Sequence, residues 1–162
     1  MTVALWRIGV DTASDTADDL GGKGAAITGG RWNRPDHPVV YCASSIALAV
    51  LETVVHLGLQ DLPLNRYLVR IDVPQALWDA RKRDTHATLA VGWDALPAGK
   101  VSLDAGDAWL KSNDGLLYQV PSVIVPEEGN LLINPRHPDA ARLVAVKLRR
   151  WQYDARLHAA GP

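Results

Sequence analysis

The feature that most constrains this chain is an apolar stretch of helical length, SSIALAVLETVVHLGLQ, at residues 44–60. Ser44 and Ser45 are good candidates for the helix N-cap, because a hydroxyl accepts a free backbone N–H. Gly58 is a candidate for the helix end. The apolar residues extend nearly all the way round the helix, which is typical of burial on most sides. The sequence therefore predicts a core helix around which the other elements are arranged.

Short apolar or alternating segments on both sides of this helix predict strands. Strands are expected at 3–9, 39–43, 66–74, 116–126 (broken at Pro121), 131–135 and 142–154, a long loop at 11–30, mixed structure at 75–100, and a short helix at 104–113 ended by Gly115. The order of one strand, one helix and then mostly strands differs from a repeating βαβ pattern. We therefore expect an α+β fold, a compact single domain of mostly antiparallel strands with a buried helix.

The length and charge of the chain exclude several classes of protein. A chain of 162 residues suits a single domain over 1–162. The net charge of −1, without a long basic or acidic run, argues against a general nucleic-acid binder. The N-terminus lacks the pattern of a signal peptide, and no apolar run reaches the roughly 18 residues of a membrane helix. A cytoplasmic protein without membrane attachment is expected.

Neither a disulfide framework nor a metal site is expected. The single cysteine, Cys42, excludes an internal disulfide and a multi-cysteine metal site, and it fits a small buried hydrophobe. The histidines also lack H-E-x-x-H or similar ligand spacing. They lie at positions 37, 56, 86, 137 and 158.

Glu52 is the most informative polar residue, because it interrupts the apolar segment ALAVLETVVHL. Helical spacing places Ser45, Ala49, Glu52 and His56 along one face. A buried carboxylate without a partner is costly. Two interpretations stay open: a surface glutamate hydrogen-bonded to His56, or a partly buried carboxylate that a partner holds for chemistry.

The segment TGGRWN at 28–33 combines a glycine turn with a cation, an indole and an amide. Backbone N–H groups of such a turn can form an anion nest, and Arg31 can clamp a phosphate. The segment is neither a Walker loop nor a G-x-G-x-x-G fingerprint, so its local pattern favours a β-turn with a surface arginine. Arg7 allows the same two interpretations.

Tyr41 and Ser122 are further candidates, each with a structural alternative. Tyr41 precedes the 44–60 helix and is either a core or rim aromatic or a platform for a flat ring. Ser122, in VPSVIVP, lacks the G-x-S-x-G context of a nucleophile. It either bonds neighbouring backbone or orients Glu52 or a substrate phosphate.

Five segments together resemble the RES domain family in their order and spacing: LWRI, GGRWN, VVYCASSIALAVLETVVH, GDAWL and VPSVIVPEEGNLLINPRHP. The resemblance spans Leu5 to about Leu148 and is weakest at 75–103, where no substrate-gating loop is assigned. It implies a toxin of a bacterial toxin–antitoxin pair with a fold similar to ADP-ribosyltransferase toxins. The functional residues of the family fall on Arg31, Tyr41, Glu52 and Ser122.

The resemblance also implies an enzyme with NAD+ as its substrate and no metal. Departure of nicotinamide gives a transition state like an oxocarbenium ion, which Glu52 would stabilise while binding the ribose hydroxyls. Arg31 would pair with the pyrophosphate, and Arg7 is a second candidate for phosphate. Tyr41 would stack on nicotinamide, and Ser122 would orient Glu52 or bond a phosphate.

The acceptor of the ADP-ribose separates two expectations. Hydrolysis or phosphorolysis of NAD+ is the leading one, and mono-ADP-ribosylation of a host protein is the alternative. Related transferase toxins often carry an acidic residue two positions before the catalytic glutamate, where this chain has Val50, which favours water or phosphate.

A more distant alternative is an RNA-targeting toxin or a non-catalytic interaction module. The basic residues in 142–151 would be its footprint, but the near-neutral charge and the missing histidine pair for RNA cleavage argue against it. The expected partner is an Xre-type antitoxin that blocks the site and supplies any contact with DNA. A toxin homodimer within that complex is left open.

Overall fold

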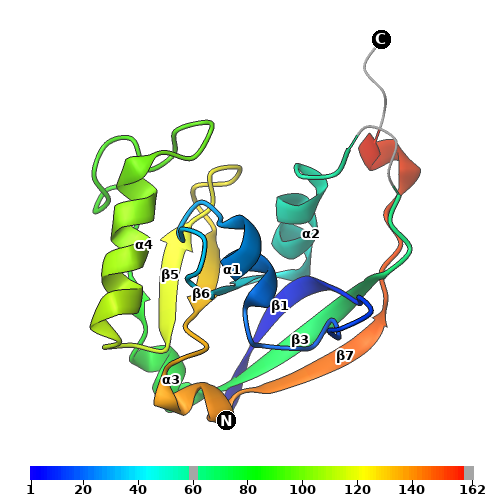
Figure 1. The fold of residues 1–162 in the computed structure, drawn as a ribbon, viewed down its shortest axis with the longest axis horizontal. Helices are drawn as coiled ribbons and strands as arrows, with labels where there is room; N and C mark the ends of the chain where they lie inside the picture. Colours follow the sequence, from blue (N-terminus) through cyan, green and yellow to red (C-terminus); the bar gives the residue numbers. More distant parts are fainter. Residues whose placement is uncertain (59–61, 159–162) are drawn as a thin grey trace.

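The computed structural model describes residues 1–58 and 62–158, which form a mixed seven-stranded sheet with helices on both faces (Figure 1). The strand order is β4-β5-β6-β2-β1-β3-β7, and every pair is antiparallel except β4 with β5. The strands are β1 (Thr2–Val10), β2 (Val40–Ala43), β3 (Arg66–Pro74), β4 (Lys82–Arg83), β5 (Leu117–Pro121), β6 (Gly129–Ile133) and β7 (Val144–Arg150). This confirms the expected α+β fold.

The helices agree less well with the sequence-based boundaries. They are α1 (Lys23–Thr28), α2 (Ile46–Val54), α3 (Gln75–Asp79) and α4 (Lys100–Ser112), with 3-10 turns η1 (Pro138–Arg142) and η2 (Ala155–His158). The expected loop at 11–30 contains α1, so that expectation was wrong in part. The expected 104–113 helix begins earlier, at Lys100, and ends at Ser112, where Asn113 and not Gly115 is the C-cap, in a left-handed conformation (φ 53°).

The core helix, α2, begins as expected, and Ala47 is its exposed residue between Ile46 and Val54. The Ser45 hydroxyl accepts the backbone N–H of Leu48 at 3.1 Å, and the helix ends at Val54, before Gly58. Positions 59 and 60 of the expected stretch lie outside the described residues. The expected burial on most sides holds for most of the helix: Leu48, Ala49 and Val50 are buried and Ala47 is exposed, while Val55, just after the helix, is 55% exposed.

The strand register defines two faces of the sheet. Residues directly opposed in an antiparallel pair point to the same face. Ala43 of β2 lies opposite Trp6 on one side and Asn130 on the other, and Asn130 in turn lies opposite Val120. Because α2 packs on Ala43 and α4 packs near Val120, we call this the α2–α4 face. Figure 1 shows these two helices set apart, with β5 and β6 between them in the view.

The opposite face, here the α3 face, carries the other half of the core. It includes Leu5, Cys42 and Val69, and Trp78 of α3 packs against it together with Ala17 of the 11–22 loop. Strand alternation assigns each β residue to one face or the other. The faces therefore decide which of the candidate residues can meet.

Candidate active site

Glu52 is held by two side-chain donors on one carboxylate oxygen. Ser122 Oγ donates to Glu52 Oε1 at 2.7 Å, and Asn130 Nδ2 donates to the same oxygen at 2.6 Å. The other oxygen, Oε2, makes no hydrogen bond to residues 1–58 or 62–158. The expected surface pair with His56 is not formed within this part of the chain, and His56 is exposed. The arrangement leaves one carboxylate oxygen fixed and the other available.

Ser122 is fully buried just after β5, and its hydroxyl has a single direction in which to donate. Ser122 Oγ accepts the backbone N–H groups of Ile124 and Val125, both at 3.1 Å. A hydroxyl has two acceptor sites and one hydrogen. The hydrogen is therefore directed at Glu52, and the turn after β5 serves to orient this carboxylate.

Tyr41 and Asn33 hold the GGRWN loop through buried hydrogen bonds. Tyr41 Oη donates to Asn33 Oδ1 at 2.6 Å and accepts the Trp32 N–H at 3.1 Å. Asn33 Nδ2 also donates to the carbonyl oxygens of Ala25, Arg34 and His37. Burial raises the pKa of Tyr41 to about 12, so it remains a neutral phenol at physiological pH. The Tyr41 hydroxyl is committed to the loop.

The glycines of the loop are explained by this packing. A Cβ at Gly30 would lie 2.7 Å from Tyr41 Oη and 2.9 Å from Asn33 Oδ1, and Gly29 has a φ of +70°. Both positions therefore favour glycine for reasons of loop structure. The packing of the loop is sufficient to account for both glycines.

Trp32 anchors the loop in the core. Its side chain is 3% exposed and stacks on Trp93, with ring centroids 6.2 Å apart. The backbone of Trp32 also touches α4, because a Cβ at Gly106 would lie 1.7 Å from the Trp32 carbonyl oxygen.

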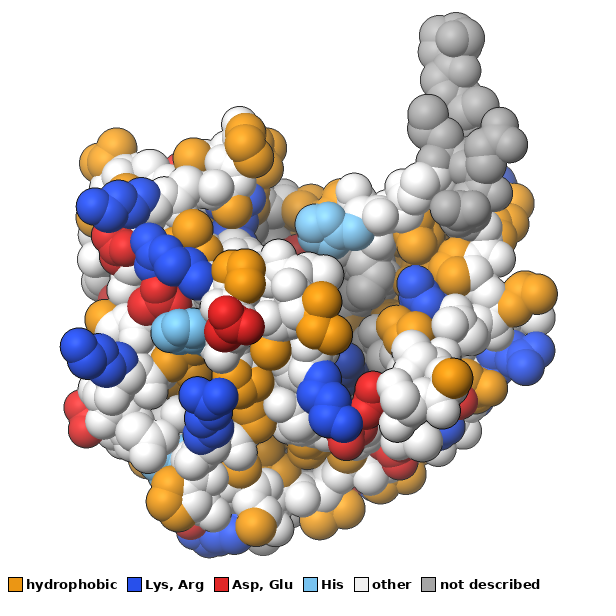
Figure 2. Space-filling model, in the orientation of Figure 1, with side chains coloured by type: hydrophobic (Ala, Val, Ile, Leu, Met, Phe, Trp, Pro, Cys, Tyr) orange, Lys and Arg blue, Asp and Glu red, His pale blue; other side chains and the backbone are white. Residues whose placement is uncertain are grey.

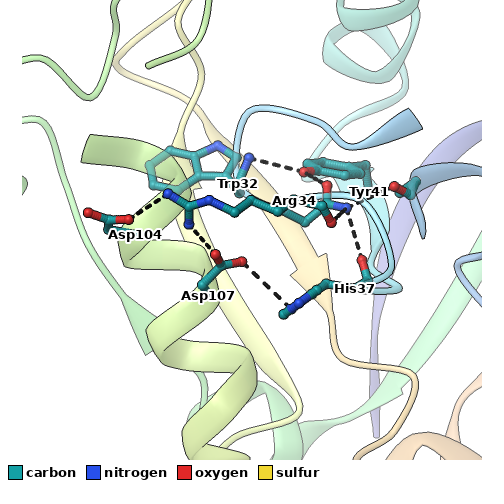
Figure 3. Close-up of polar contacts among 8 residues, drawn as sticks. Trp32, Arg34, His37, Tyr41, Asp104 and Asp107 are labelled. Atoms are coloured by element: carbon teal, nitrogen blue, oxygen red, sulfur yellow. Dashed lines mark hydrogen bonds and ion pairs between the residues drawn. The ribbon is translucent and has the colours of Figure 1, made fainter. Parts of the chain in front are cut away.

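Charged side chains tie the same loop to α4 (Figure 3). Arg34 donates to Asp107 and, at 2.7 Å, to Asp104, and His37 Nδ1 lies 3.8 Å from Asp107 Oδ1. These hydrogen bonds raise the pKa of Arg34. The loop is thus fixed from the inside by Tyr41 and from the outside by α4.

Arg31 projects from this fixed loop and has a tether of its own. Its Nη1 donates to the carbonyl oxygens of Trp93 (3.1 Å) and Ala95 (2.8 Å), so part of the unassigned 75–103 region orients Arg31. Burial lowers the pKa of Arg31, and the nearby charge of Glu52 opposes that shift. Nε and Nη2 make no hydrogen bond to the residues described, which leaves one edge of the guanidinium for an anion.

Arg7 does not join this group. It lies next to Trp6 along β1 and opposite Val69 of β3, so it points to the α3 face. Burial lowers its pKa, and Cys42 and Asp19 oppose that shift. Strand alternation therefore removes Arg7 from the phosphate contacts considered above. Cys42, on the same face, is a buried thiol whose pKa burial raises to about 12.

Asn130 is the residue that the sequence reasoning missed. It lies in the segment VPSVIVPEEGNLLINPRHP, one of the five that carry the family resemblance. A polar residue at the start of a strand is ordinary at an exposed edge. Only the packing of α2 on β1 and β2, which brings Glu52 within hydrogen-bond distance of β6, places a carboxylate beside Asn130.

Neither a metal-binding cluster nor a spanning helix is found in the described part of the chain. Within 1–58 and 62–158, no three His, Cys, Asp or Glu side chains are grouped so as to hold a metal ion. None of the helices there has the length and hydropathy needed to cross a membrane.

Comparison with known proteins assigns the chain to a family, because the RES domain matches residues 4–156. The chain belongs to the RES domain family. A curated relative, the Prs ADP-ribosylating toxin of Sphingobium sp. (strain YBL2), is 56% identical over 157 residues, which are 97% of this chain and 98% of the relative. Toxin Res of Pseudomonas putida is 36% identical over 155 residues, or 94% of this chain and 98% of the relative.

A solved structure supports the fold of this RES domain. In the crystal structure of the M. tuberculosis MbcT–MbcA toxin–antitoxin complex, one chain aligns with a TM-score of 0.59 and 19% identity, covering 92% of this chain and 85% of that chain. At this identity the likeness shows a shared architecture.

Proposed function

We propose that this RES domain is a toxin that cleaves the nicotinamide–ribose bond of NAD+ and transfers ADP-ribose to a protein. The observation that carries the proposal is the arrangement of Glu52, whose Oε1 accepts two hydrogen bonds while Oε2 accepts none among the described residues. Arg31 is a second part of it, because the charge of Glu52 acts on the pKa of Arg31. The high identity to a toxin named for ADP-ribosylation supports transfer over other fates.

The chemistry suits these residue types. The C1′–N bond breaks with its electron pair staying on nicotinamide, which leaves as a neutral amide and leaves positive charge on the ribose. A fixed carboxylate beside that carbon stabilises the charge as it develops, and this is the role proposed for Glu52. The incoming nucleophile then forms the new bond to C1′ and loses a proton.

The other candidate residues would bind and position the substrate. The free edge of Arg31 suits the pyrophosphate, which a planar guanidinium can grip with two hydrogen bonds. The half-buried ring of Tyr41 would support nicotinamide, while its hydroxyl holds the loop. Ser122 is proposed to orient Glu52 rather than to bind phosphate, because all of its hydrogen-bonding capacity is in use.

The first acceptor to test is Prs, which the name of the Sphingobium relative gives as the target of that toxin. A second fate, release of ADP-ribose to water or phosphate, is favoured by Val50. This residue lies two positions before Glu52 and is a buried aliphatic residue in the α2 core, so it offers no acidic group to an acceptor.

The partners proposed for this toxin follow from its family. The MbcT protein of similar fold was solved in a toxin–antitoxin complex, and a toxin that consumes NAD+ has to be restrained in its own cell. We propose an Xre-type antitoxin that covers Glu52 and Arg31 and makes any contact with DNA, with a toxin homodimer as a further element of that complex. Figure 2 shows cationic and anionic side chains interspersed on one face, unlike the one-sign patch of a nucleic-acid binder.

The proposal is tested with NAD+ labelled on its adenylate, purified toxin and purified Prs, with nicotinamide release followed in parallel. Label on Prs supports transfer, whereas free ADP-ribose, or its phosphate when phosphate is added, supports the second fate. Glu52→Gln is the inactive control. No nicotinamide release by the wild type under any of these conditions would overturn the proposal.

A further inference from the structure

Asn130 occupies a central place beside the proposed catalytic carboxylate. It lies on β6 between β5 and β2, opposite Val120 and Ala43, and so points to the α2–α4 face. Its Nδ2 is 2.6 Å from Glu52 Oε1. Ser122 reaches the same oxygen from the turn after β5. Donors from two adjacent segments of the sheet therefore converge on one oxygen of a helix side chain.

The hydrogen bonds of Asn130 differ from those of a structural asparagine. The amide of Asn33 donates to three carbonyl oxygens and accepts from Tyr41, so it is satisfied at both ends. Asn130 Oδ1, by contrast, is buried without a hydrogen-bond partner among the described residues. An unpaired buried acceptor is costly, and native structures keep few of them.

The negative charge of Glu52 explains why this cost is tolerated. If the amide were turned over, Oδ1 would face the carboxylate, and two acceptors would meet at hydrogen-bond distance. The observed orientation gives the donor to Glu52 and leaves Oδ1 unpaired. Asn130 therefore donates to the carboxylate even though this orientation leaves its own Oδ1 without a partner.

We propose that Asn130 is a positioning residue that, together with Ser122, fixes Glu52 Oε1 and so presents Oε2 to the ribose. Two donors on one oxygen prevent the carboxylate from rotating and settle which oxygen remains free. A group that is already oriented needs no reorganisation when charge develops on the substrate. The inference rests on the proposed cleavage of NAD+ and extends it to a residue outside the Arg31, Tyr41, Glu52 and Ser122 set.

The test compares Asn130→Leu, which keeps the approximate shape without a donor, with Asn130→Asp, which keeps the volume and places an acceptor against Glu52. Nicotinamide release at saturating and limiting NAD+ gives kcat and KM without reference to the acceptor. We expect kcat to fall about 10- to 100-fold, the range found when a residue that orients a metal ligand is replaced. The loss should be greater for Asn130→Asp, and KM should change by less than about threefold because Arg31 is untouched.

Combination with Ser122→Ala probes the shared oxygen. Because both donors act on Glu52 Oε1, the losses in kcat should be non-additive, with the double variant departing from the product of the two single effects. Independent effects that multiply would contradict a common task at this oxygen.

Asn134→Leu is the matched control. It removes a buried amide just after β6 that bonds Asn113 at 2.8 Å and makes no contact with Glu52. We expect it to lower Tm while leaving kcat per folded molecule unchanged.

If a folded Asn130→Leu or Asn130→Asp keeps the wild-type kcat while Glu52→Gln is inactive, the positioning role is overturned and the proposed function stands. If Glu52→Gln is itself active, the proposed function fails first.

Discussion

The guanidinium of Arg31 is bonded to the protein through one nitrogen, and its opposite edge is open to a ligand. Nη1 is tied to the carbonyl oxygens of Trp93 and Ala95, while the Nε–Nη2 edge makes no bond within the described residues. A lysine ammonium is a single point of charge and cannot do both tasks.

For Arg31→Lys we therefore expect kcat/KM for NAD+ to fall about 10- to 100-fold, in line with roughly 1.5–3 kcal/mol for a hydrogen bond to a charged group. Most of the change should be in KM, and Tm should change little, because the loop is fixed by other residues. Steady-state nicotinamide release checks this. Wild-type kinetics in the lysine variant would exclude Arg31 as a phosphate ligand.

The Ser122 hydroxyl contacts both the turn after β5 and Glu52, the proposed catalytic carboxylate. In Ser122→Ala the N–H groups of Ile124 and Val125 lose their acceptor and Glu52 loses a donor. We expect a loss of up to about 1–3 kcal/mol in the free energy of unfolding, because two part-buried N–H donors lose their acceptor, together with a lower kcat. Urea unfolding and nicotinamide release measure the two effects.

The control for Ser122→Ala is Ser102→Ala in α4. Ser102 is also fully buried, and its hydroxyl bonds the Gly99 carbonyl oxygen at 3.3 Å within its own helix. It should change stability alone. A Ser122→Ala variant that loses stability but keeps its kcat would place Ser122 in the fold and outside the chemistry.

These residues were only partly accessible from the sequence. Local pattern favoured a turn arginine for Arg31 and left Glu52 open between a surface residue and a partly buried carboxylate, and the resemblance to a family was needed to bring them together. Arg7 was considered for phosphate binding because strand alternation shows which residues of β1 share a face but does not show which face α2 covers. Asn130 was missed for the same reason: its significance depends on a helix contact from far along the chain.

At the scale of elements, the contact between α4 and the GGRWN loop depends on a missing side chain. A Cβ at Gly106 would lie 1.7 Å from the Trp32 carbonyl oxygen and 3.1 Å from its Cα. In Gly106→Ala the helix and the loop have to separate. We expect destabilisation of about 1–3 kcal/mol, as for overpacked cores. We also expect a lower kcat/KM, because Arg31 directly precedes Trp32 in the chain and would move with it.

Gly24→Ala in α1 is the matched control, since a Cβ there meets no atom within 4 Å. In a helix with open space, alanine should stabilise by about 0.5–1 kcal/mol. Chemical denaturation of both variants measures the change in the free energy of unfolding, which should be a loss for Gly106→Ala and a gain for Gly24→Ala. Equal and small effects would mean that α4 can shift away from Trp32 at no cost.

Element boundaries followed the strength of their signals. The alternation in 66–74 reproduced β3, and the Ser45 cap marked the start of α2. The start of α4 was missed because its N-cap, Gly99, offers no side-chain acceptor. Its end was predicted to within one residue, but Asn113 and not Gly115 is the left-handed C-cap. The six-residue α1 has neither a side-chain cap nor a buried face to reveal it.

At the scale of the whole molecule, the candidate site residues lie on or beside one half of the sheet. Strands β5, β6 and β2 carry or adjoin Ser122, Asn130 and Tyr41, while β1, β3 and β7 form the other half of the sheet. This second half is tied together at its end by Lys147 of β7. Lys147 Nζ bonds both oxygens of Asp11, just after β1, at 3.0 Å, and lies over the Tyr67 ring of β3.

This pair makes stability depend on pH in a defined direction. The hydrogen bond from Lys147, followed by that from the Ala17 N–H, lowers the pKa of Asp11 below its ordinary value. The contribution of Asp11 to the free energy of unfolding is therefore present above that ordinary pKa, about 3.9. It is lost as the pH falls through the folded-state pKa. The same contact raises the pKa of Lys147, so the contribution of the lysine is complete below its ordinary value of about 10.4 and is lost as the pH rises through the raised folded-state pKa.

Lys147→Met keeps much of the aliphatic stem over Tyr67 and removes the charge. We expect it to unfold at a lower urea concentration than the wild type at pH 7, with the gap narrowing steadily as the pH falls below about 4, where Asp11 becomes protonated in both proteins. Lys111→Met is the control, since exposed Lys111 forms no ion pair within residues 1–58 and 62–158. A gap for Lys147→Met that stays constant from pH 7 to pH 3 would show that the lysine stabilises the sheet through packing on Tyr67 and not through Asp11.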